Sequence, residues 1–177
     1  MTRKGIALSA IVGLVVFVGA CRNATSAVDL VGQFDVATKQ PVTGNFAVQD
    51  VDLNGEQKKA IAVPVDSRVT FKVQVPDEGW LRLSVGTKPE SWTQDGNGSL
   101  FFVGVSDGRT FDELFSQHVN PFGNAGDRKW IQVWVDLSAY AGEEIDLVFN
   151  TRSSPEGQPP DPRADMPLWG EPEIVVR

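Results

Sequence analysis

The strongest constraint on the fold is a strict alternation of apolar and polar residues in several short segments. Residues 68–75, "RVTFKVQV", place valine or phenylalanine at every second position. Residues 80–86, "WLRLSVG", and 130–137, "WIQVWVDL", alternate in the same way, with leucine, isoleucine or valine at every second position. Side chains of a β-strand point alternately to opposite faces, so a period of two is typical of a half-buried strand. We therefore expect each segment to be a strand with one face on the core.

Turn signals separate these segments. In residues 46–65, "FAVQDVDLNGEQKKAIAVPV", Asn54-Gly55 stands between two extended runs and predicts a β-hairpin. Residues 112–119, "DELFSQHV", fit a helical turn or a strand, and we interpret them as a strand. About nine strands and no long helix after residue 20 predict an all-β sandwich or barrel. The proline-rich residues 150–168 are expected to form a long connection.

The first residues have the pattern of a signal peptide. Arg3 and Lys4 are followed by 13 apolar or small residues, 6–18. A helix of that length covers about 20 Å, which is less than the roughly 30 Å hydrocarbon core of a bilayer. We therefore expect residues 1–20 to form a signal-peptide helix that directs export.

The end of this segment, Val18-Gly19-Ala20-Cys21, resembles the bacterial lipobox. The resemblance implies cleavage before Cys21 and lipidation of its thiol; an ordinary secretory peptide and an uncleaved anchor are the alternatives. Cys21 is the only cysteine, so a lipidated chain has no thiol for a disulfide. Residues 21–27 would then be a short tether to a membrane, and residues 28–177 a single domain. This places the protein in the bacterial cell envelope, outside the cytoplasm, on the outer membrane if the host has one.

The charge of the chain argues against nucleic acid as a partner. The whole chain carries a net charge of −7. Removing residues 1–20 leaves 14 basic against 23 acidic side chains, a net charge of −9. Such a surface repels a polyanionic backbone, and anionic lipid is repelled as well. Attachment to a membrane would therefore depend on the acyl chains.

Two longer segments carry a family resemblance. Residues 127–152, "DRKWIQVWVDLSAYAGEEIDLVFNTR", and 168–174, "LWGEPEI", resemble jelly-roll, galactose-binding-like domains of bacterial extracytoplasmic proteins. These domains share their architecture with many carbohydrate-binding modules. The similarity covers about residues 46–175 and implies a jelly-roll β-sandwich without catalytic activity. No binding motif of the family can be transferred to individual residues of this chain.

Catalytic chemistry has little support. His118 is the only histidine, and neither neighbouring residue is a nucleophile. The carboxylate pairs Glu143/Glu144 and Asp50/Asp52 are expected by chance among 23 acidic residues. We therefore expect a protein that is not an enzyme.

A metal site is not indicated either. Asp50, Asp52, Asn54 and Gly55 match the start of an EF-hand loop, but Ile61 stands where that loop needs a glutamate. Jelly-roll domains often carry a structural calcium ion. The sequence leaves open whether this chain binds one, and it identifies no calcium ligands. We assign no metal ligand and no cofactor.

The polar side of the alternating segments suggests a ligand surface. If the aliphatic residues fill the sandwich, the opposite face presents Lys72, Gln74, Arg82, Gln132 and Trp134. Aromatic rings stack on the C–H faces of sugars, and amides and charged groups orient the hydroxyls. The hypothesis is a glycan site on one sheet face; alternatively, Trp134 packs beneath the proline-rich loop with its indole N–H on a carbonyl.

Other tryptophans have competing interpretations. Trp92 lies in a polar loop, residues 86–99, where it would contact ligand or anchor the loop. Trp130 stands at a strand entrance and would cover the sandwich edge. Trp80 and Trp169 are expected to be structural.

Together these patterns predict a non-catalytic, lipid-anchored envelope protein that binds glycan through one sheet face. The alternative is a structural or adaptor lipoprotein that uses this face, or residues 150–168, to hold an envelope protein complex. A hydrolase is a third, minor reading.

Overall fold

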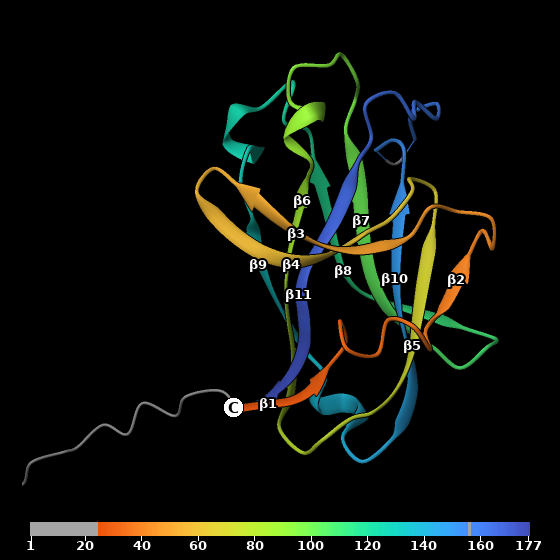
Figure 1. Cartoon of the computed structure of the whole chain (residues 1–177). Coiled ribbons are helices and arrows are strands. Elements are labelled where there is room, and N and C mark those ends of the chain that lie inside the picture. Colours follow the sequence, from red (N-terminus) through yellow and green to blue (C-terminus); the bar gives the residue numbers. More distant parts are fainter. Residues whose placement is uncertain (1–24, 156) are drawn as a thin grey trace, which may run out of the picture.

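The computed structural model describes residues 25–155 and 157–177, which form two antiparallel β-sheets packed face to face (Figure 1). The predicted signal peptide, the lipidation site Cys21 and residues 22–24 lie outside this range. The strands are β1 (Thr25–Asp29), β2 (Thr38–Gln40), β3 (Ala47–Leu53), β4 (Glu56–Ala62), β5 (Arg68–Gln74), β6 (Gly79–Thr87), β7 (Ser99–Ser106), β8 (Phe111–Val119), β9 (Ile131–Asp136), β10 (Glu144–Arg152) and β11 (Pro167–Val176). Short 3-10 turns are η1 (Pro89–Ser91), η2 (Ala125–Asp127) and η3 (Ser138–Tyr140). In this part of the chain, no helix has the length and apolar character needed to cross a membrane.

The strand order confirms the predicted all-β jelly-roll sandwich. Sheet A has the order β3-β4-β11-β6-β9, with β1 also paired to β11. Sheet B has the order β2-β5-β10-β7-β8. Residues 112–119 lie in β8 and form a strand, as expected. β1 begins at Thr25, three residues before the predicted start of the domain at Val28.

The alternating segments bury the faces that the sequence predicted. Their inward valines, leucines and phenylalanines form one core between the sheets. Trp169 of sheet A is 1% exposed, and its ring centroid lies 5.0 Å from that of Phe101 and 4.8 Å from that of Phe149, both in sheet B. Trp169 therefore joins the two sheets, and its expected structural role is confirmed.

A second, smaller apolar cluster lies on the other side of sheet A, under the β3–β4 hairpin. The hairpin curls across β11 and β6 (Figure 1). It buries Leu53, Ala60, Ala62, Trp130 and Leu168. A Cβ at Gly170 would lie 2.9 Å from Cζ3 of Trp130, and one at Gly86 would lie 2.7 Å from Cδ1 of Leu53. Glycines at these two positions allow the hairpin to lie against the sheet.

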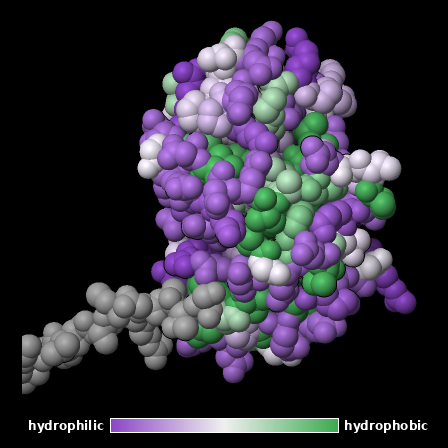
Figure 2. Space-filling model, viewed as in Figure 1, coloured by the Kyte–Doolittle hydropathy of each residue, from purple (hydrophilic) through white to green (hydrophobic). Residues whose placement is uncertain are grey.

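The surface is mostly hydrophilic in the view of Figure 2, where apolar residues gather near the centre. Among the described residues, the large apolar side chains most open to solvent are Val36 and Val42. Both lie next to β2, the edge strand of sheet B.

Candidate functional site

The outer face of sheet A brings together three of the residues predicted to bind ligand. In the β6–β9 pairing, Arg82 lies opposite Trp134, and Ser84 lies opposite Gln132. Their neighbours Val133 and Val135 point into the core, so the alternation directs Gln132 and Trp134 outward. The expected orientation of both strands is confirmed.

Lys72 and Gln74 do not belong to this surface, and the prediction of a single five-residue cluster is wrong. Both lie on β5 of sheet B, so the sandwich core separates them from Trp134. Lys72 instead forms exposed ion pairs with Glu144, at 3.7 Å, and Asp146, at 3.5 Å. Alternation shows that a side chain points away from the core, but it does not show which sheet carries it.

A bulge in β11 shapes the surface next to Arg82. Gly170 pairs with Ser84. Glu173 pairs with Arg82, so β11 advances three residues while β6 advances two. The additional residue is a β-bulge, and Glu171 within it has a φ of 45°. The carboxylates of Glu171 and Glu173, at this bulge, lie beside Lys58 of β4 and Arg82 of β6.

These elements enclose a groove of about 230 Å³, called here the sheet A groove. It is lined by Lys58, Arg82, Leu83, Ser84, Gln132, Gly170, Glu171 and Glu173. Six of these eight residues carry polar side chains. Lys58, Glu171 and Glu173 were not predicted for this surface; the only signal was the break in alternation at "GEPE", residues 170–173.

Ion pairs fix the charged side chains of the groove. The Nε of Arg82 donates a hydrogen bond to Oε1 of Glu173 at 2.9 Å, and its Nη2 donates to the same oxygen. Lys58 Nζ lies 2.9 Å from Oε1 of Glu56 and 3.4 Å from Oε2 of Glu171. Charge-assisted hydrogen bonds of this kind hold side chains in a defined geometry.

Lys58 is charged at neutral pH. Burial lowers the pKa of its ammonium group, but Glu56 and Glu171 outweigh burial and raise the pKa above 10.5. The groove therefore offers the ammonium of Lys58, the guanidinium of Arg82, an amide and two carboxylates. This is a mixture of donors and acceptors.

Trp134 is half-buried beside the groove, and two arginine side chains contact its ring. The guanidinium carbon of Arg82 lies 5.6 Å from the ring centroid, and that of Arg177 lies 4.5 Å from it. Cation–π contacts of this kind orient both partners. The ring faces the exterior, as predicted, and it lies on the outer sheet face and not under the proline-rich loop.

Trp92 and Trp130 lie outside the groove and have anchoring contacts. The indole N–H of Trp92 donates to the backbone oxygen of Thr87 at 3.1 Å, and its ring packs against the cluster under the hairpin. Trp130 is 5% exposed and donates from Nε1 to the backbone oxygen of Glu56 at 2.9 Å. These contacts favour the loop-anchor interpretation of Trp92.

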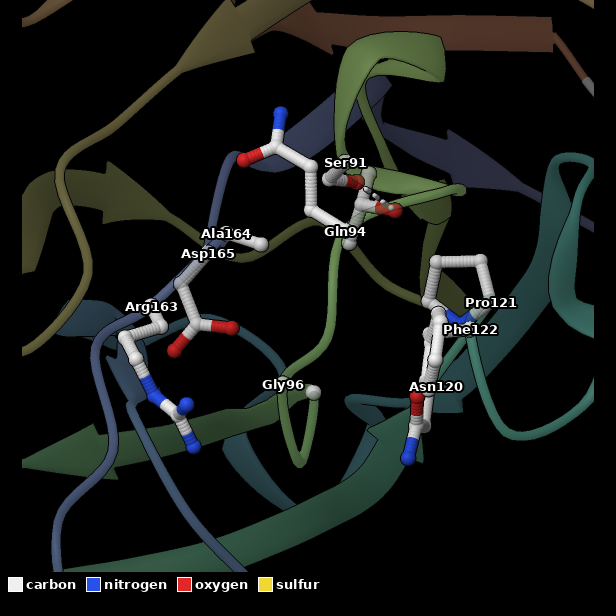
Figure 3. A pocket seen from close by; sticks show the side chains of 11 residues that line it. Ser91, Gln94, Gly96, Asn120, Pro121, Phe122, Arg163, Ala164 and Asp165 are labelled. Carbon is white, nitrogen blue, oxygen red and sulfur yellow. Dashed lines mark hydrogen bonds between the residues drawn. The ribbon is translucent and has the colours of Figure 1, made fainter.

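A second concave site lies among the loops at the end of the sandwich (Figure 3). Arg163 and Asp165 approach it from one side, and Asn120, Pro121 and Phe122 lie on the other. Its volume is about 10 Å³, which is close to that of one water molecule on this measure. In this conformation the loop pocket is too small for a sugar ring.

Asp165 in this pocket has an unusual acidity. Burial raises the pKa of its carboxyl to about 7; the nearby Ser99 hydroxyl opposes this shift, and the carboxylates of Asp161 and Asp66 add to it. Its Oδ2 is buried and has no hydrogen-bond partner within the described part of the chain. In the folded protein, Asp165 therefore keeps its proton up to about pH 7.

In residues 25–155 and 157–177, no three histidine, cysteine, aspartate or glutamate side chains are grouped in a way that would hold a metal ion. Asp52 Oδ1 accepts the backbone N–H of Gly55 at 2.8 Å, as in a tight turn. Asn54 and Gly55 both have positive φ, 60° and 90°, which confirms the predicted hairpin turn. His118 Nε2 lies 2.7 Å from the backbone oxygen of Asn97.

Sequence comparison finds one partial relative. No family model matches the chain. An uncharacterized protein of Archaeoglobus fulgidus is 37% identical over 105 residues, which are 58% of this chain and 25% of that protein. The chain thus spans about a quarter of the curated relative that it matches.

Solved structures show what the fold is. A ZmpB chain of Clostridium perfringens, which contains an M60 catalytic domain and the modules CBM51-1 and CBM51-2, matches 78% of this chain with a TM-score of 0.55 and 15% identity. The match covers 14% of that chain. The CBM51 from Clostridium perfringens GH95, in complex with methyl-galactose, matches 78% of this chain and 92% of its own length, with a TM-score of 0.50 and 15% identity.

The domain shares its jelly-roll β-sandwich fold with these carbohydrate-binding modules. The suspected fold resemblance is confirmed. At 15% identity the likeness concerns the fold, and the ligand must be argued from the site.

Proposed function

We propose that this protein is a non-catalytic glycan-binding module and that its ligand lies in the sheet A groove. The observation that carries the proposal is the groove itself, about 230 Å³ in volume and lined mainly by polar side chains next to Trp134. The fold it shares with a CBM51 solved with methyl-galactose supports the same ligand class.

The chemistry of the groove suits a sugar. Hydroxyl groups both donate and accept, and the groove offers donors from Lys58 and Arg82, acceptors from Glu171 and Glu173, and both from Gln132. The exposed part of the Trp134 ring adds an apolar surface at the rim. A few hydrogen bonds and one stacking contact predict weak binding, with Kd about 10 µM to 1 mM.

Titration of the full-length protein with methyl-galactose and a panel of neutral and acidic oligosaccharides tests the proposal. We expect Trp134→Ala and Gln132→Ala to weaken binding about tenfold each, because they remove the apolar rim and an orienting amide. The matched control is Lys72→Ala with Gln74→Ala on sheet B, which we expect to bind like the wild type.

This location would be contradicted if the Trp134 and Gln132 variants bound sugar as tightly as the wild type does. Loss of binding in the sheet B control would contradict it as well. A flat response to all sugars together with co-purification of one protein partner would favour an adaptor function.

We also propose that the protein is anchored to the bacterial envelope through lipid on Cys21. Support comes from the lipobox-like Val18-Gly19-Ala20-Cys21 and the basic and apolar residues before it. Expression in bacteria with an alkyne-labelled palmitate should label the wild type and should not label Cys21→Ser. Label in the serine variant, or none in the wild type, would refute the anchor.

A further inference from the structure

Arg177 lies over two tryptophans, one of which also contacts Arg82 of the sheet A groove. Its guanidinium carbon is 5.1 Å from the ring centroid of Trp80 and 4.5 Å from that of Trp134. Trp80 belongs to β6 and Trp134 to the adjacent β9, while Arg177 follows β11 on the other side of β6. Three neighbouring strands therefore bring these side chains together.

Arg177 differs from the other cationic side chains around the groove, because those are paired with carboxylates. Arg82 is bound to Glu173, and Lys58 is bound to Glu56 and Glu171. Within residues 25–155 and 157–177, the guanidinium of Arg177 forms no ion pair and donates no side-chain hydrogen bond. The residue is exposed, so its charge is open to solvent.

Stacking leaves the donors of a guanidinium available. The five N–H groups of arginine lie in the plane of the group, whereas contact with an aromatic ring uses its face. An arginine positioned over tryptophan rings is thus oriented in advance, and less conformational entropy is lost when its edge binds an anion. The planar fork matches the two oxygens of a carboxylate or a sulfate.

We infer that Arg177 is an anion receptor and that the glycan bound by this protein carries an acidic group, either carboxylate or sulfate. The inference rests on the proposed glycan function and gives the ligand its chemical class. Arg177 contacts the Trp134 ring, which also contacts Arg82 of the groove. Arg177 and the groove therefore lie on the same face of sheet A, and we expect one oligosaccharide to contact both.

The test compares three trisaccharides of similar size in titrations of the full-length protein: galactotriose, trigalacturonic acid and a sulfated galactotriose. We expect at least one acidic sugar to bind about tenfold more tightly than the neutral one. Arg177→Gln should abolish this preference and change the affinity for galactotriose less than about twofold. Arg177→Lys keeps the charge without the fork and should retain part of the preference.

Arg109→Gln is the matched control, because Arg109 is exposed in the turn after β7 of sheet B. It should leave the preference unchanged. A preference that survives in Arg177→Gln, or a neutral sugar bound as tightly as both acidic ones, would overturn the inference while the glycan function stands. Tighter binding of galactotriose by Arg177→Gln would mean that the arginine blocks the Trp134 ring and does not bind an anion. This result would also overturn the inference. If the wild type binds none of the three, the glycan function falls as well.

Discussion

At the level of single residues, the side chains on the outer face of sheet A are held by contacts among themselves. Arg82 is the clearest case, because it contacts the Trp134 ring and hydrogen-bonds to Glu173. The side chain of Arg82 is 36% exposed and that of Glu173 is 19% exposed, so solvent screens the pair only in part. We expect this pair to orient the groove and to add modestly to stability.

A double-mutant cycle tests the Arg82–Glu173 pair. Arg82→Gln and Glu173→Gln should each lower the free energy of unfolding by about 1–2 kcal/mol, because each leaves a charge without its partner. The double variant should lose less than the sum of the two. Strict additivity in urea unfolding would show that the two side chains do not interact.

Asp165 predicts a pH dependence of stability. Its pKa is about 7 in the folded state against an ordinary value of 3.8, so the folded protein retains a proton that the unfolded chain has released. This group therefore favours folding fully below about pH 4, and its contribution declines as the pH rises to about 7.

Asp165→Asn removes this dependence. The variant should be about 1–2 kcal/mol more stable than the wild type at pH 8, less than the full shift implies because the carboxyl is partly exposed. The difference should shrink toward pH 4. Denaturant unfolding between pH 4 and pH 8 measures it, and parallel stability curves for both proteins would contradict the account.

At the level of secondary-structure elements, the β3–β4 hairpin and the β11 bulge form the groove. The hairpin supplies Lys58, and the bulge supplies Glu171 and Glu173. Alternation and the Asn54-Gly55 turn were enough to predict the hairpin. They did not predict that it lies across sheet A, because that depends on the apolar cluster around Trp130 and on the absence of a Cβ at Gly86 and Gly170.

Gly170→Ala tests this packing. The new methyl group would lie 2.9 Å from Cζ3 of Trp130 and 3.2 Å from Cδ of Lys58, so the Trp130 ring and the Lys58 side chain packed beside it must shift. We expect a loss of about 1–3 kcal/mol in unfolding free energy, as in other overpacked sites. Binding of glycan should also weaken, because Lys58 moves. Unchanged stability and binding would show that the hairpin adapts freely.

At the level of the whole molecule, the sandwich explains which predictions could be made from the sequence. A period of two identifies the buried side of each strand, so the core residues and the outward direction of Gln132 and Trp134 followed from pattern alone. Strand order depends on contacts between distant segments, and β5 and β6 are consecutive in the chain yet lie in opposite sheets. This is why Lys72 and Gln74 were assigned to the wrong surface.

The proposed ligand has one location, the sheet A groove. The most direct test is backbone NMR of the full-length protein during titration with galactotriose and trigalacturonic acid. We predict shifts of the amide signals around Ser84, Gln132 and Gly170 in β6, β9 and β11, with the signals of β5 around Lys72 unchanged. Shifts confined to sheet B, or to the loops around Asp165 and Phe122, would contradict a binding site in the sheet A groove.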